Sequence, residues 1–414
     1  MRPVIRCLLL CLLIATIHPA IAQKAPARTV LYNKVLGMLL GSAIGDAMGA
    51  PTEMWTRDAI ALDYGLVNRL DTMVREPSPE GTWVYNLPAG GTTDDTRWKM
   101  LASRYLLTQS RTLDPKAFAQ TILNEYQNSI QKLKKTEGLD PEPYEQRSRE
   151  MAWLQEWVRV ARPYLKNDLT GYANALSRFY GGENVCAGML YAPSVGGFYP
   201  GNPTDAYAQT YAISIFDQGY ARDIAGLTAA LVSAAMASNA TPESILNVLR
   251  DVDPERFFES RLVGRSSYRV YRQARAIVAD ANRIQSTRGL VLTMPMPRRG
   301  PVDTLMLARM QRAYTLLEAQ NEDLPFHAAE IHLVNLTALL FSNFDFEKAM
   351  TFVINYGRDN DTTGAVTGAI LGAYWGADKL PKDMVAKVLA VNKERLGTDL
   401  EDVANKLTDR IMAR

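Results

Sequence analysis

Residues 37–49 read GMLLGSAIGDAMG, and residues 364–376 read GAVTGAILGAYWG. Each segment carries four glycines at four-residue intervals, a spacing that places them on one face of a helix. Glycine costs about 1 kcal/mol relative to alanine inside a helix, so a face of glycines indicates that another backbone approaches it closely. We therefore expect two tightly packed helices whose glycine faces lie against each other or against one shared neighbour. Such packing would bring the two ends of the chain together.

Two short acidic clusters accompany the glycine segments. Residues 93–96 read TDDT and residues 359–362 read DNDT, and each cluster comes just before a stretch with helical periodicity. If the glycine faces meet, four carboxylates crowd into one space, where two like charges about 4 Å apart repel by roughly 4 kcal/mol at an effective dielectric of about 20. Bound cations or raised pKa values relieve such repulsion. The sequence therefore predicts a divalent-metal site made by both clusters.

The available residue types restrict which metal such a site would hold. The second cluster copies the start of an EF-hand calcium loop from Asp359, but the twelfth position of that loop requires Glu and here is Ile370. Zinc sites use His and Cys ligands, and beyond residue 22 the chain offers only His327, His332 and Cys186. The two histidines are not spaced as an i,i+4 pair, so we expect ordinary helix residues. Carboxylate and hydroxyl ligands suit magnesium, manganese or calcium.

Residues 1–22 have the pattern of a secretory signal peptide. Two arginines start the chain, residues 7–17 are an apolar run, and residues 20–22 read AIA, a small-x-small cleavage signal. We therefore expect an exported protein, periplasmic or extracellular, with no membrane attachment after cleavage. Losing two of the 46 basic residues would leave 44, which equals the number of acidic residues, so no general attraction to nucleic acid is expected. Cys186 would remain as the single cysteine, so no internal disulfide is expected.

Helical periodicity dominates the rest of the chain, and no run of alternating strands is present. The expected fold class is therefore all-α, a single globular multi-helix bundle, with a signal peptide at 1–22, a lead-in at 23–33 and one domain at 34–414. Residues 192–202, rich in glycine, proline and aromatics, are expected to form a loop, and residues 286–301, with prolines and basic residues, an exposed loop or a small hairpin. Apolar residues recur at three- and four-residue spacing in residues 117–133, 150–160, 224–237, 242–249 and 328–340.

Three motifs together carry a resemblance to a known family. Residues 41–53 read GSAIGDAMGAPTE, residues 93–96 read TDDT, and residues 355–362 read NYGRDNDT, followed directly by the second glycine segment. In this order and spacing, the sequence resembles the ADP-ribosylglycohydrolase family, which includes dinitrogenase-reductase-activating glycohydrolases and the ADP-ribosylarginine and ADP-ribosylserine hydrolases. The motifs bracket nearly the whole mature chain. The resemblance implies an all-α fold of the ADP-ribosylglycohydrolase type.

The resemblance also implies a binuclear magnesium centre, with manganese as an alternative. Glu53 matches the family's mobile acidic residue, which orients water or transfers a proton at the ribose anomeric carbon; the alternative is a capping or surface glutamate. Asp95 and Asp361 would take part in catalysis as well as in metal binding. Asp46 would be a polar helix residue or a support for the ligands. The implied ligands are Thr93, Asp94 and Asp95 from the first cluster and Asp359, Asp361 and Thr362 from the second.

A segment in the middle of the chain resembles the family's substrate loop. Residues 184–193 read NVCAGMLYAP, and residues 196–202 read GGFYPGN. Backbone N–H groups and aromatic rings in such a loop suit a phosphate and a base; the alternative is a structured turn without a ligand. The candidate substrate-binding residues are Asn184, Gly188, Gly196, Gly197, Phe198 and Tyr199.

Three positions in the expected substrate region depart from the family pattern. Leu190 stands where many relatives have Arg, Arg358 follows Gly357 where relatives have a glycine pair, and residues 213–217 lack the usual Thr-His. None of the three departures touches an implied metal ligand. The chemistry is therefore better defined than the identity of the substrate.

The hypothesis from the sequence is a metal-dependent N- or O-glycosidase. It would cleave the bond at the ribose anomeric carbon of an ADP-ribosyl or related ribosyl substrate, either an ADP-ribosylated protein or a small compound. A serine hydrolase would need Gly-x-Ser-x-Gly and a P-loop enzyme Gly-x-x-x-x-Gly-Lys, and both motifs are missing. Two alternatives stay open: a hydrolase of the same fold acting on another exported nucleoside or glycoside, and a non-catalytic ADP-ribose-binding or structural relative. A structural role would not require all six ligand positions.

Overall fold

The computed structural model describes residues 27–136, 138, 141–296 and 303–414. Within these ranges the chain forms eighteen α-helices, and its regular β-structure is limited to two strands of two residues each. The prediction of an all-α fold is therefore confirmed. Residues 1–22, the predicted signal peptide, lie outside the described residues, so export stays a prediction. Helix α1 begins at Arg28, inside the segment expected to be a lead-in.

Helices account for nearly all of the regular elements along the described chain. The α-helices are α1 (Arg28–Gly49), α2 (Arg57–Asp63), α3 (Asp94–Thr108), α4 (Pro115–Lys134), α5 (Pro141–Ala152), α6 (Gln155–Leu165), α7 (Leu169–Leu176), α8 (Ala187–Phe198), α9 (Pro203–Ile213), α10 (Ala221–Ala235), α11 (Pro242–Asp251), α12 (Ser266–Ala281), α13 (Thr304–Glu318), α14 (Ala328–Ser342), α15 (Phe346–Tyr356), α16 (Asn360–Trp375), α17 (Lys382–Arg395) and α18 (Leu400–Met412). The 3-10 helices are η1 (Ala50–Thr52), η2 (Phe179–Gly182), η3 (Phe257–Glu259) and η4 (Ala377–Lys379), and the strands are β1 (Trp55–Thr56) and β2 (Gly357–Arg358).

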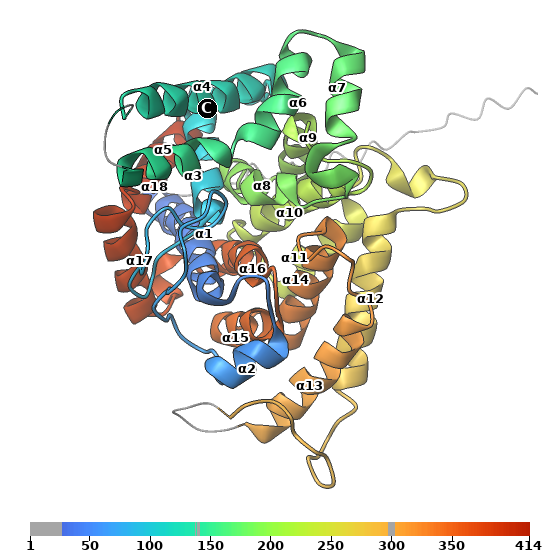
Figure 1. The fold of residues 1–414 in the computed structure, drawn as a ribbon. Coiled ribbons are helices and arrows are strands. Elements are labelled where there is room, and N and C mark those ends of the chain that lie inside the picture. The colour runs from blue at the N-terminus through green and yellow to red at the C-terminus, as the bar shows by residue number, and fades with distance from the viewer. Residues whose placement is uncertain (1–26, 137, 139–140, 297–302) are drawn as a thin grey trace, which may run out of the picture.

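The two glycine faces pack directly on each other. A Cβ added at Gly45 would overlap the carbonyl oxygen of Gly364, and one added at Gly41 would overlap the carbonyl oxygen of Gly368. The pairing runs in opposite directions along the two helices, so α1 and α16 are antiparallel and in backbone-to-backbone contact. Both helices lie in the middle of the molecule (Figure 1), where nearly every residue of α16 is buried. The first of the two predicted packing arrangements is therefore confirmed.

The α1–α16 pair fixes the positions of the two acidic clusters. The first cluster begins α3, whose N-terminus rests against the C-terminal part of α1, and the second begins α16 itself. Strand β1 pairs antiparallel with β2, with Trp55 opposite Arg358 and Thr56 opposite Gly357. The pair ties the segment after α1 to the backbone directly before Asp359. The α1–α16 pair and the β1–β2 pair therefore hold both acidic clusters against the same part of the fold.

Segment 192–202, expected to be a loop, is mostly helical, so this expectation was wrong. Helix α8 runs through Phe198, with Pro193 inside it, and every residue of the helix is buried. Gly196 lets the backbone of α10 approach, since a Cβ there would lie 2.5 Å from the carbonyl oxygen of Ala229. Tertiary packing thus overrides the local preference of glycine and proline for turns. The other expected loop, 286–301, is irregular over the described residues up to 296.

Most of the helices expected from periodicity are present, with one exception. Residues 150–160 were expected to form one helix, but α5 ends at Ala152 and α6 begins at Gln155. The break turns Trp153 and Leu154 into the core, where both are buried. The start of α11 agrees with its sequence signal, because Thr241 caps the helix by accepting a hydrogen bond from Ser244 N ahead of the predicted N1 proline.

One continuous hydrophobic core extends through the bundle. In Figure 1, helices α4, α6 and α7 lie at the top of the molecule, α13 lies at the bottom, and α12 runs along the right-hand edge. Cys186 is buried and is the only cysteine among the described residues. In that part of the chain, no helix is both long and apolar enough to cross a bilayer.

Candidate metal centre

Both acidic clusters sit at the N-termini of helices. Thr93 is the N-cap of α3, with Asp94 and Asp95 in the first turn, and Asp359 is the N-cap of α16, with Asp361 in its first turn. The exposed N–H groups and the dipole at a helix N-terminus favour negative side chains there. Local helix chemistry therefore explains why each cluster is acidic, and the packing of α1 on α16 brings the two N-termini together.

A reciprocal pair of threonine–aspartate contacts joins the clusters. Thr362 Oγ1 donates to Asp95 Oδ2 at 2.9 Å, and Thr93 Oγ1 lies 3.1 Å from Asp361 Oδ2. The residues of each pair are 267 and 268 positions apart in the sequence, and all four side chains are buried. The predicted meeting of the two clusters is thus present in the structure at hydrogen-bond distance.

Asp46 holds the first cluster in place from α1. Its Oδ1 accepts from Thr93 N at 2.9 Å, and its Oδ2 accepts from Thr96 N at 3.0 Å and from Thr96 Oγ1 at 2.6 Å. Thr93 Oγ1 also lies 3.0 Å from Asp46 Oδ1, so its single proton is available either to Asp46 or to Asp361. Asp46 therefore supports the site, because it fixes the N-terminus of α3 against α1.

Negative charge at the centre is not fully compensated by the protein. Burial, followed by the neighbouring carboxylates, raises the pKa of Asp359 to about 8 and that of Asp46 to about 7. The pKa values of Asp94 and Asp361 are raised well above their ordinary range for the same reasons. Among the described residues, no hydrogen-bond donor reaches the buried Oδ1 of Asp361. The centre therefore has the charge and the free oxygen that a cation would satisfy.

The residue types at the acidic centre fit magnesium, although they do not form a preformed cage. In the described ranges, no three or more His, Cys, Asp or Glu side chains are arranged to hold a metal ion. The hydroxyls of Thr93 and Thr362 contact carboxylates of the centre, so a bound cation would replace these threonine–aspartate hydrogen bonds. All six residues offer hard oxygen atoms, the ligand type that Mg²⁺ and Mn²⁺ prefer.

A buried lysine lies within this acidic centre. Lys99 is one turn after Asp95 on α3, and its Nζ lies 3.1 Å from Asp95 Oδ1 and 3.0 Å from Asp95 O. Both side chains are 1% exposed. Lys99 was not among the residues predicted from the sequence, although the i,i+4 spacing from Asp95 to Lys99 is a readable signal for a helical ion pair.

Glu53 borders the same space and is held by an arginine. Arg75 Nη1 lies 2.5 Å from Glu53 Oε2 and also donates to the carbonyl oxygen of Ala50 at 3.0 Å. The Glu53 side chain is 13% exposed, and the residue is the C-cap of η1. Arg75 comes from the irregular segment between α2 and α3, where no sequence pattern pointed to it. Its contact fixes the direction of the Glu53 carboxylate.

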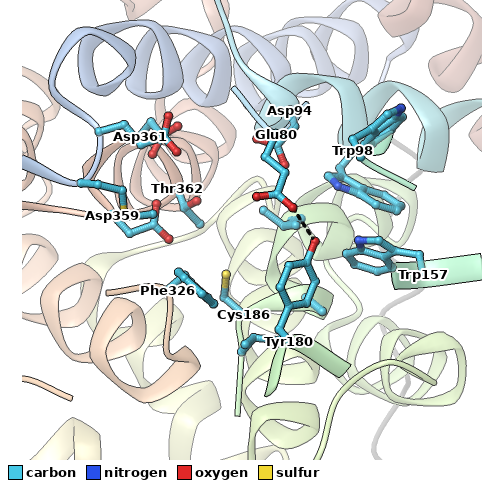
Figure 2. A pocket seen from close by; sticks show the side chains of 16 residues that line it. Glu80, Asp94, Trp98, Trp157, Tyr180, Cys186, Phe326, Asp359, Asp361 and Thr362 are labelled. Atoms are coloured by element: carbon cyan, nitrogen blue, oxygen red, sulfur yellow. Dashed lines mark hydrogen bonds between the residues drawn. The ribbon is translucent and has the colours of Figure 1, made fainter. Parts of the chain in front are cut away.

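A cavity opens beside the acidic centre. Figure 2 shows Asp359, Asp361 and Thr362 on one side of it and Trp98 and Trp157 on the other, with Tyr180 and Glu80 joined by a hydrogen bond between them. The Tyr180 hydroxyl donates to Glu80 Oε1 at 3.0 Å. The cavity is lined by the acids Glu53, Glu80, Asp94, Asp359 and Asp361, by the aromatics Trp98, Trp153, Trp157, Tyr180 and Phe326, and by Met54, Val185, Cys186, Ala187, Leu190 and Thr362.

Two residues of the cavity lining have a left-handed backbone. Met54 has φ +65° and Tyr180 has φ +44°, a conformation that is unusual for large side chains. Such conformations cost roughly 1–3 kcal/mol each and cluster at functional sites. Their position on the cavity lining supports the view that this cavity is the site of function.

None of the six candidate substrate-binding residues lines the cavity. Gly196, Gly197, Phe198 and Tyr199 are buried in the packing around α8, and Gly188 N donates to Asp217 Oδ1. Asn184 also lies outside the lining, with its carbonyl oxygen accepting from Ala328 N. The part of this region that does face the cavity is the start of α8 and the residues just before it. The predicted segment therefore borders the cavity, but through residues other than those predicted.

The aromatic residues of the lining were not predicted from the sequence either. Trp98 could have been found, because it follows Asp94 by four residues and so lies on the same face of α3. Trp153, Trp157 and Tyr180 come from α6 and its neighbours, and no local pattern connects them to the acidic clusters. Tertiary packing alone brings them to the cavity.

Comparison with known proteins gives a match over almost the whole described chain. The family model described as ADP-ribosylglycohydrolase matches residues 27–414. A solved structure titled ADP-ribosylglycohydrolase-related protein complex aligns with a TM-score of 0.55 at 20% identity, over 93% of this chain and 100% of that one. At this identity the structural likeness shows the fold alone.

Two curated proteins match over shorter segments. The uncharacterized protein YegU of Escherichia coli (strain K12) is 31% identical over 93 residues, which is 22% of this chain and 26% of that protein. The ADP-ribosyl-[dinitrogen reductase] glycohydrolase of Rhodospirillum rubrum is 34% identical over 84 residues, 20% of this chain and 25% of that protein. The matches thus span about a quarter of the length of each curated relative.

Proposed function

The chain belongs to the ADP-ribosylglycohydrolase family, and from this premise we propose that it is a metal-dependent hydrolase that cleaves the bond at the ribose anomeric carbon of an ADP-ribosyl or related ribosyl compound. The family by itself indicates a hydrolase of the ADP-ribosylglycohydrolase type. The observation that carries the finer proposal is the pair of reciprocal contacts, Thr362 to Asp95 and Thr93 to Asp361, at the edge of a cavity. Of the six proposed ligands, Asp94, Asp359, Asp361 and Thr362 line that cavity, which supports the proposal that a ribose binds beside them.

The proposed centre holds two Mg²⁺ ions, with Mn²⁺ as the alternative. Its ligands would be Thr93, Asp94 and Asp95 from the start of α3 and Asp359, Asp361 and Thr362 from the start of α16. When bound, the ions would supply Lewis-acid chemistry, lowering the pKa of water and holding ribose hydroxyls. Asp46 keeps the first three ligands in place through its bonds to Thr93 and Thr96.

Glu53 is the proposed proton-transfer residue. In the reaction, a bond forms between the water oxygen and the anomeric carbon, while the bond to the leaving group breaks and the leaving group keeps the electron pair. Glu53 lines the cavity and Arg75 holds it through Oε2, so its carboxylate is positioned to orient the water and accept its proton. The leaving group or solvent then takes that proton. Lys99 keeps Asp95 paired in a buried position and so helps to hold its orientation.

Metal binding tests the first half of this proposal. We expect the full-length protein to bind two Mn²⁺ ions per chain, measured by equilibrium dialysis and electron paramagnetic resonance, with Mg²⁺ competing. Asp361→Asn should lose at least one of these ions, because it removes the charge of the carboxylate through which the second cluster contacts Thr93 of the first. Asp345→Asn is the matched control, since Asp345 is an exposed N-cap of α15 and Asn caps a helix equally well. Fewer than one ion per chain at saturating metal would contradict a binuclear centre.

Hydrolysis tests the second half. ADP-ribosyl-arginine, ADP-ribosyl-serine and simple nucleosides are offered to the parent protein in Mg²⁺ and in EDTA, and to Asp361→Ala. We expect release of the leaving group from at least one compound, dependent on Mg²⁺ and lost in the variant. Equal rates for Asp361→Ala and the parent would show that the site is wrongly assigned. No turnover of any compound, with metal bound, would favour a non-catalytic binding protein.

A further inference from the structure

The backbone directly before Asp359 is left-handed at two successive residues. Gly357 has φ +79° and Arg358 has φ +62°. A Cβ at Gly357 would lie 2.5 Å from the carbonyl oxygen of Trp55, so this position requires glycine, which adopts such a conformation freely. Arg358 carries a Cβ, for which the left-handed region is unfavourable. The turn that leads into the second acidic cluster therefore depends on contacts that hold Arg358 in this conformation.

Glu330 supplies such contacts to the Arg358 side chain. Arg358 Nε donates to Glu330 Oε1 at 2.7 Å, and Arg358 Nη2 donates to Glu330 Oε2 at 2.8 Å. The Glu330 side chain is 3% exposed and lies in the first turn of α14, where the helix dipole favours a carboxylate. Two parallel hydrogen bonds between a guanidinium and a carboxylate fix both distance and direction. The ion pair thus anchors Arg358 to a buried helix.

The same carboxylate also holds the segment before α14. Glu330 Oε2 accepts from Glu322 N at 2.9 Å, and Arg358 Nη2 donates to the carbonyl oxygen of Glu322 at 2.6 Å. Four residues further along, Phe326 lines the cavity, and Figure 2 shows it on the same side as Asp359. The Glu330–Arg358 pair therefore joins two parts of the cavity lining that are distant in the sequence.

The backbone of Arg358 holds the segment that carries Glu53. Met54 N donates to the carbonyl oxygen of Arg358 at 2.7 Å, and Trp55 lies opposite Arg358 in the β1–β2 pair. Asp359, the next residue, is buried and is the N-cap of α16. A shift at Arg358 would therefore change the direction of the Asp359 carboxylate and the position of Glu53 together.

We propose that Glu330 is a positioning residue of the acidic centre: through its ion pair with Arg358, it holds the left-handed turn that directs Asp359 toward the other proposed ligands. Glu330 lies outside the cavity lining, so it acts through Arg358 rather than on a bound molecule. The consequence for metal binding rests on the proposed function. The role exists because residue 358 carries a side chain, whereas a glycine would adopt the same φ without an anchor.

The metal affinity of Glu330→Gln gives the first test. Mn²⁺ is titrated into the full-length protein and followed by electron paramagnetic resonance. We expect the dissociation constant of at least one ion to rise by about 10–100-fold, the usual effect of removing a group that supports a metal ligand. Arg358→Lys should weaken binding as well, because an ammonium group cannot replace the bidentate contact. This second variant gives the same reading if Glu330→Gln folds poorly.

Arg358→Gly combined with Glu330→Gln is the decisive variant. It removes the strained residue and its anchor together, so the turn can keep its conformation. We expect Mn²⁺ affinity within about fivefold of that of the parent, the cost of the extra backbone freedom of glycine. If Glu330 only stabilised α14, adding Arg358→Gly would not restore the affinity lost in Glu330→Gln.

Arg256 and Glu259 provide a matched control. Arg256 also has a left-handed backbone, with φ +59°, and its Nε lies 3.0 Å from Glu259 Oε1. Both side chains are well exposed, and both residues lie outside the cavity lining. Glu259→Gln and Arg256→Gly should therefore leave Mn²⁺ affinity unchanged. Equal losses of affinity in Glu259→Gln and Glu330→Gln would overturn the proposal.

Hydrogen exchange in EDTA tests the turn without any metal. The Met54 amide donates to the carbonyl oxygen of Arg358, so its exchange rate reports on the turn before Asp359. We expect this amide to exchange about tenfold or more faster in Glu330→Gln, the effect of losing a hydrogen bond between charged groups. In the double variant, the rate should return to near that of the parent.

The outcomes separate this inference from the proposed metal centre. Unchanged Mn²⁺ affinity and unchanged Met54 exchange in Glu330→Gln would overturn the inference. A loss of affinity that Arg358→Gly does not restore would also overturn it, because Glu330 would then act on α14 itself. Faster Met54 exchange that Arg358→Gly reverses, in a protein that binds no Mn²⁺, would support the positioning role and contradict the metal centre.

Discussion

Lys99 Nζ lies 3.1 Å from Asp95 Oδ1, and both side chains are 1% exposed. The chain thus places a cation of its own inside the acidic centre, one helical turn from the carboxylate with which it pairs. A charge buried without a partner is costly, and in this pair each side chain supplies the other with a partner of opposite charge. Asp95 also accepts a hydrogen bond from Thr362 through Oδ2, so it links Lys99 on α3 to the start of α16.

Replacing Lys99 by methionine should reveal how far metal ions can take over its role. We expect Lys99→Met to lower the free energy of unfolding by about 3–5 kcal/mol in EDTA, because Asp95 is left buried and unpaired. In saturating Mg²⁺ the loss should be smaller, since a bound cation would neutralise Asp95. Urea unfolding in both buffers measures the difference.

The matched control for Lys99→Met is Lys406→Met. Lys406 Nζ lies 2.6 Å from Asp402 Oδ2 with the same i,i+4 spacing, but the two side chains are 59% and 50% exposed. An exposed pair contributes at most about 1 kcal/mol. If both substitutions cost the same, burial does not set the strength of the Lys99–Asp95 pair, and the interpretation above is wrong.

The contact between α1 and α16 should not tolerate a single methyl group. Gly45→Ala would drive a Cβ into the carbonyl oxygen of Gly364, which belongs to backbone and cannot move aside. We expect a loss of about 3 kcal/mol or more in the free energy of unfolding, the upper range for overpacking. Metal binding should weaken as well, since the two helices set the distance between the clusters. Thermal unfolding and Mn²⁺ titration give the two readings.

Gly197→Ala serves as the control for the glycine contact. Its Cβ would meet the end of the flexible Met38 side chain, with Met38 Cε 2.8 Å away. The gain in helix propensity of about 1 kcal/mol should offset this small adjustment. A Gly45→Ala protein that is as stable as Gly197→Ala would show that the close approach of α1 and α16 is not required.

His332 should make the protein sensitive to acid. It is fully buried, both ring nitrogens lack hydrogen-bond partners among the described residues, and burial lowers its pKa from 6.5 to about 4. Because the pKa is lower in the folded than in the unfolded protein, the unfolded state binds more protons between pH 6.5 and 4, and stability falls as the pH falls through this window. The loss amounts to about 3 kcal/mol.

The variant that checks this assignment is His332→Leu. Urea unfolding of parent and variant is measured at about pH 6.5 and about pH 4.5, so that groups common to both proteins cancel in the comparison. The parent should lose more free energy of unfolding between these pH values than the variant, because only the parent contains His332. A difference that is constant with pH would show that His332 does not titrate as its burial requires.

Glu53→Gln should separate activity from stability. If Glu53 transfers the proton, kcat should fall by about 10²–10⁴-fold on whichever ribosyl compound is hydrolysed. The free energy of unfolding should change little, because Glu53 and Arg75 are both partly exposed. Glu76→Gln changes an exposed glutamate of the same irregular segment and should keep full activity. An active Glu53→Gln protein would place the proton transfer elsewhere.

The sequence predicted the central contact of the fold and the acidic half of the candidate site. Glycines at four-residue intervals indicate a bare helix face, and the structure shows Gly41 and Gly45 packed against Gly368 and Gly364. Acidic residues at predicted helix starts were also recognisable from local patterns. The prediction was wrong for residues 192–202, where glycine and proline indicated a loop and burial between neighbouring helices produced most of α8.

Helix starts, helix faces and close backbone contacts depend on residues within a few positions of one another, so the sequence by itself determined the all-α fold and the two halves of the candidate metal centre. Other features depend on which distant segments pack together. They are the contacts of Trp98 with Trp153 and Trp157, the Arg75–Glu53 ion pair and the hydrogen bond from Gly188 N to Asp217. Burial then raises the pKa of Asp359 to about 8 and selects the partner of each charge. Only the tertiary structure decided these features, because the strength of an electrostatic contact depends on distance and solvent exclusion in space rather than along the chain.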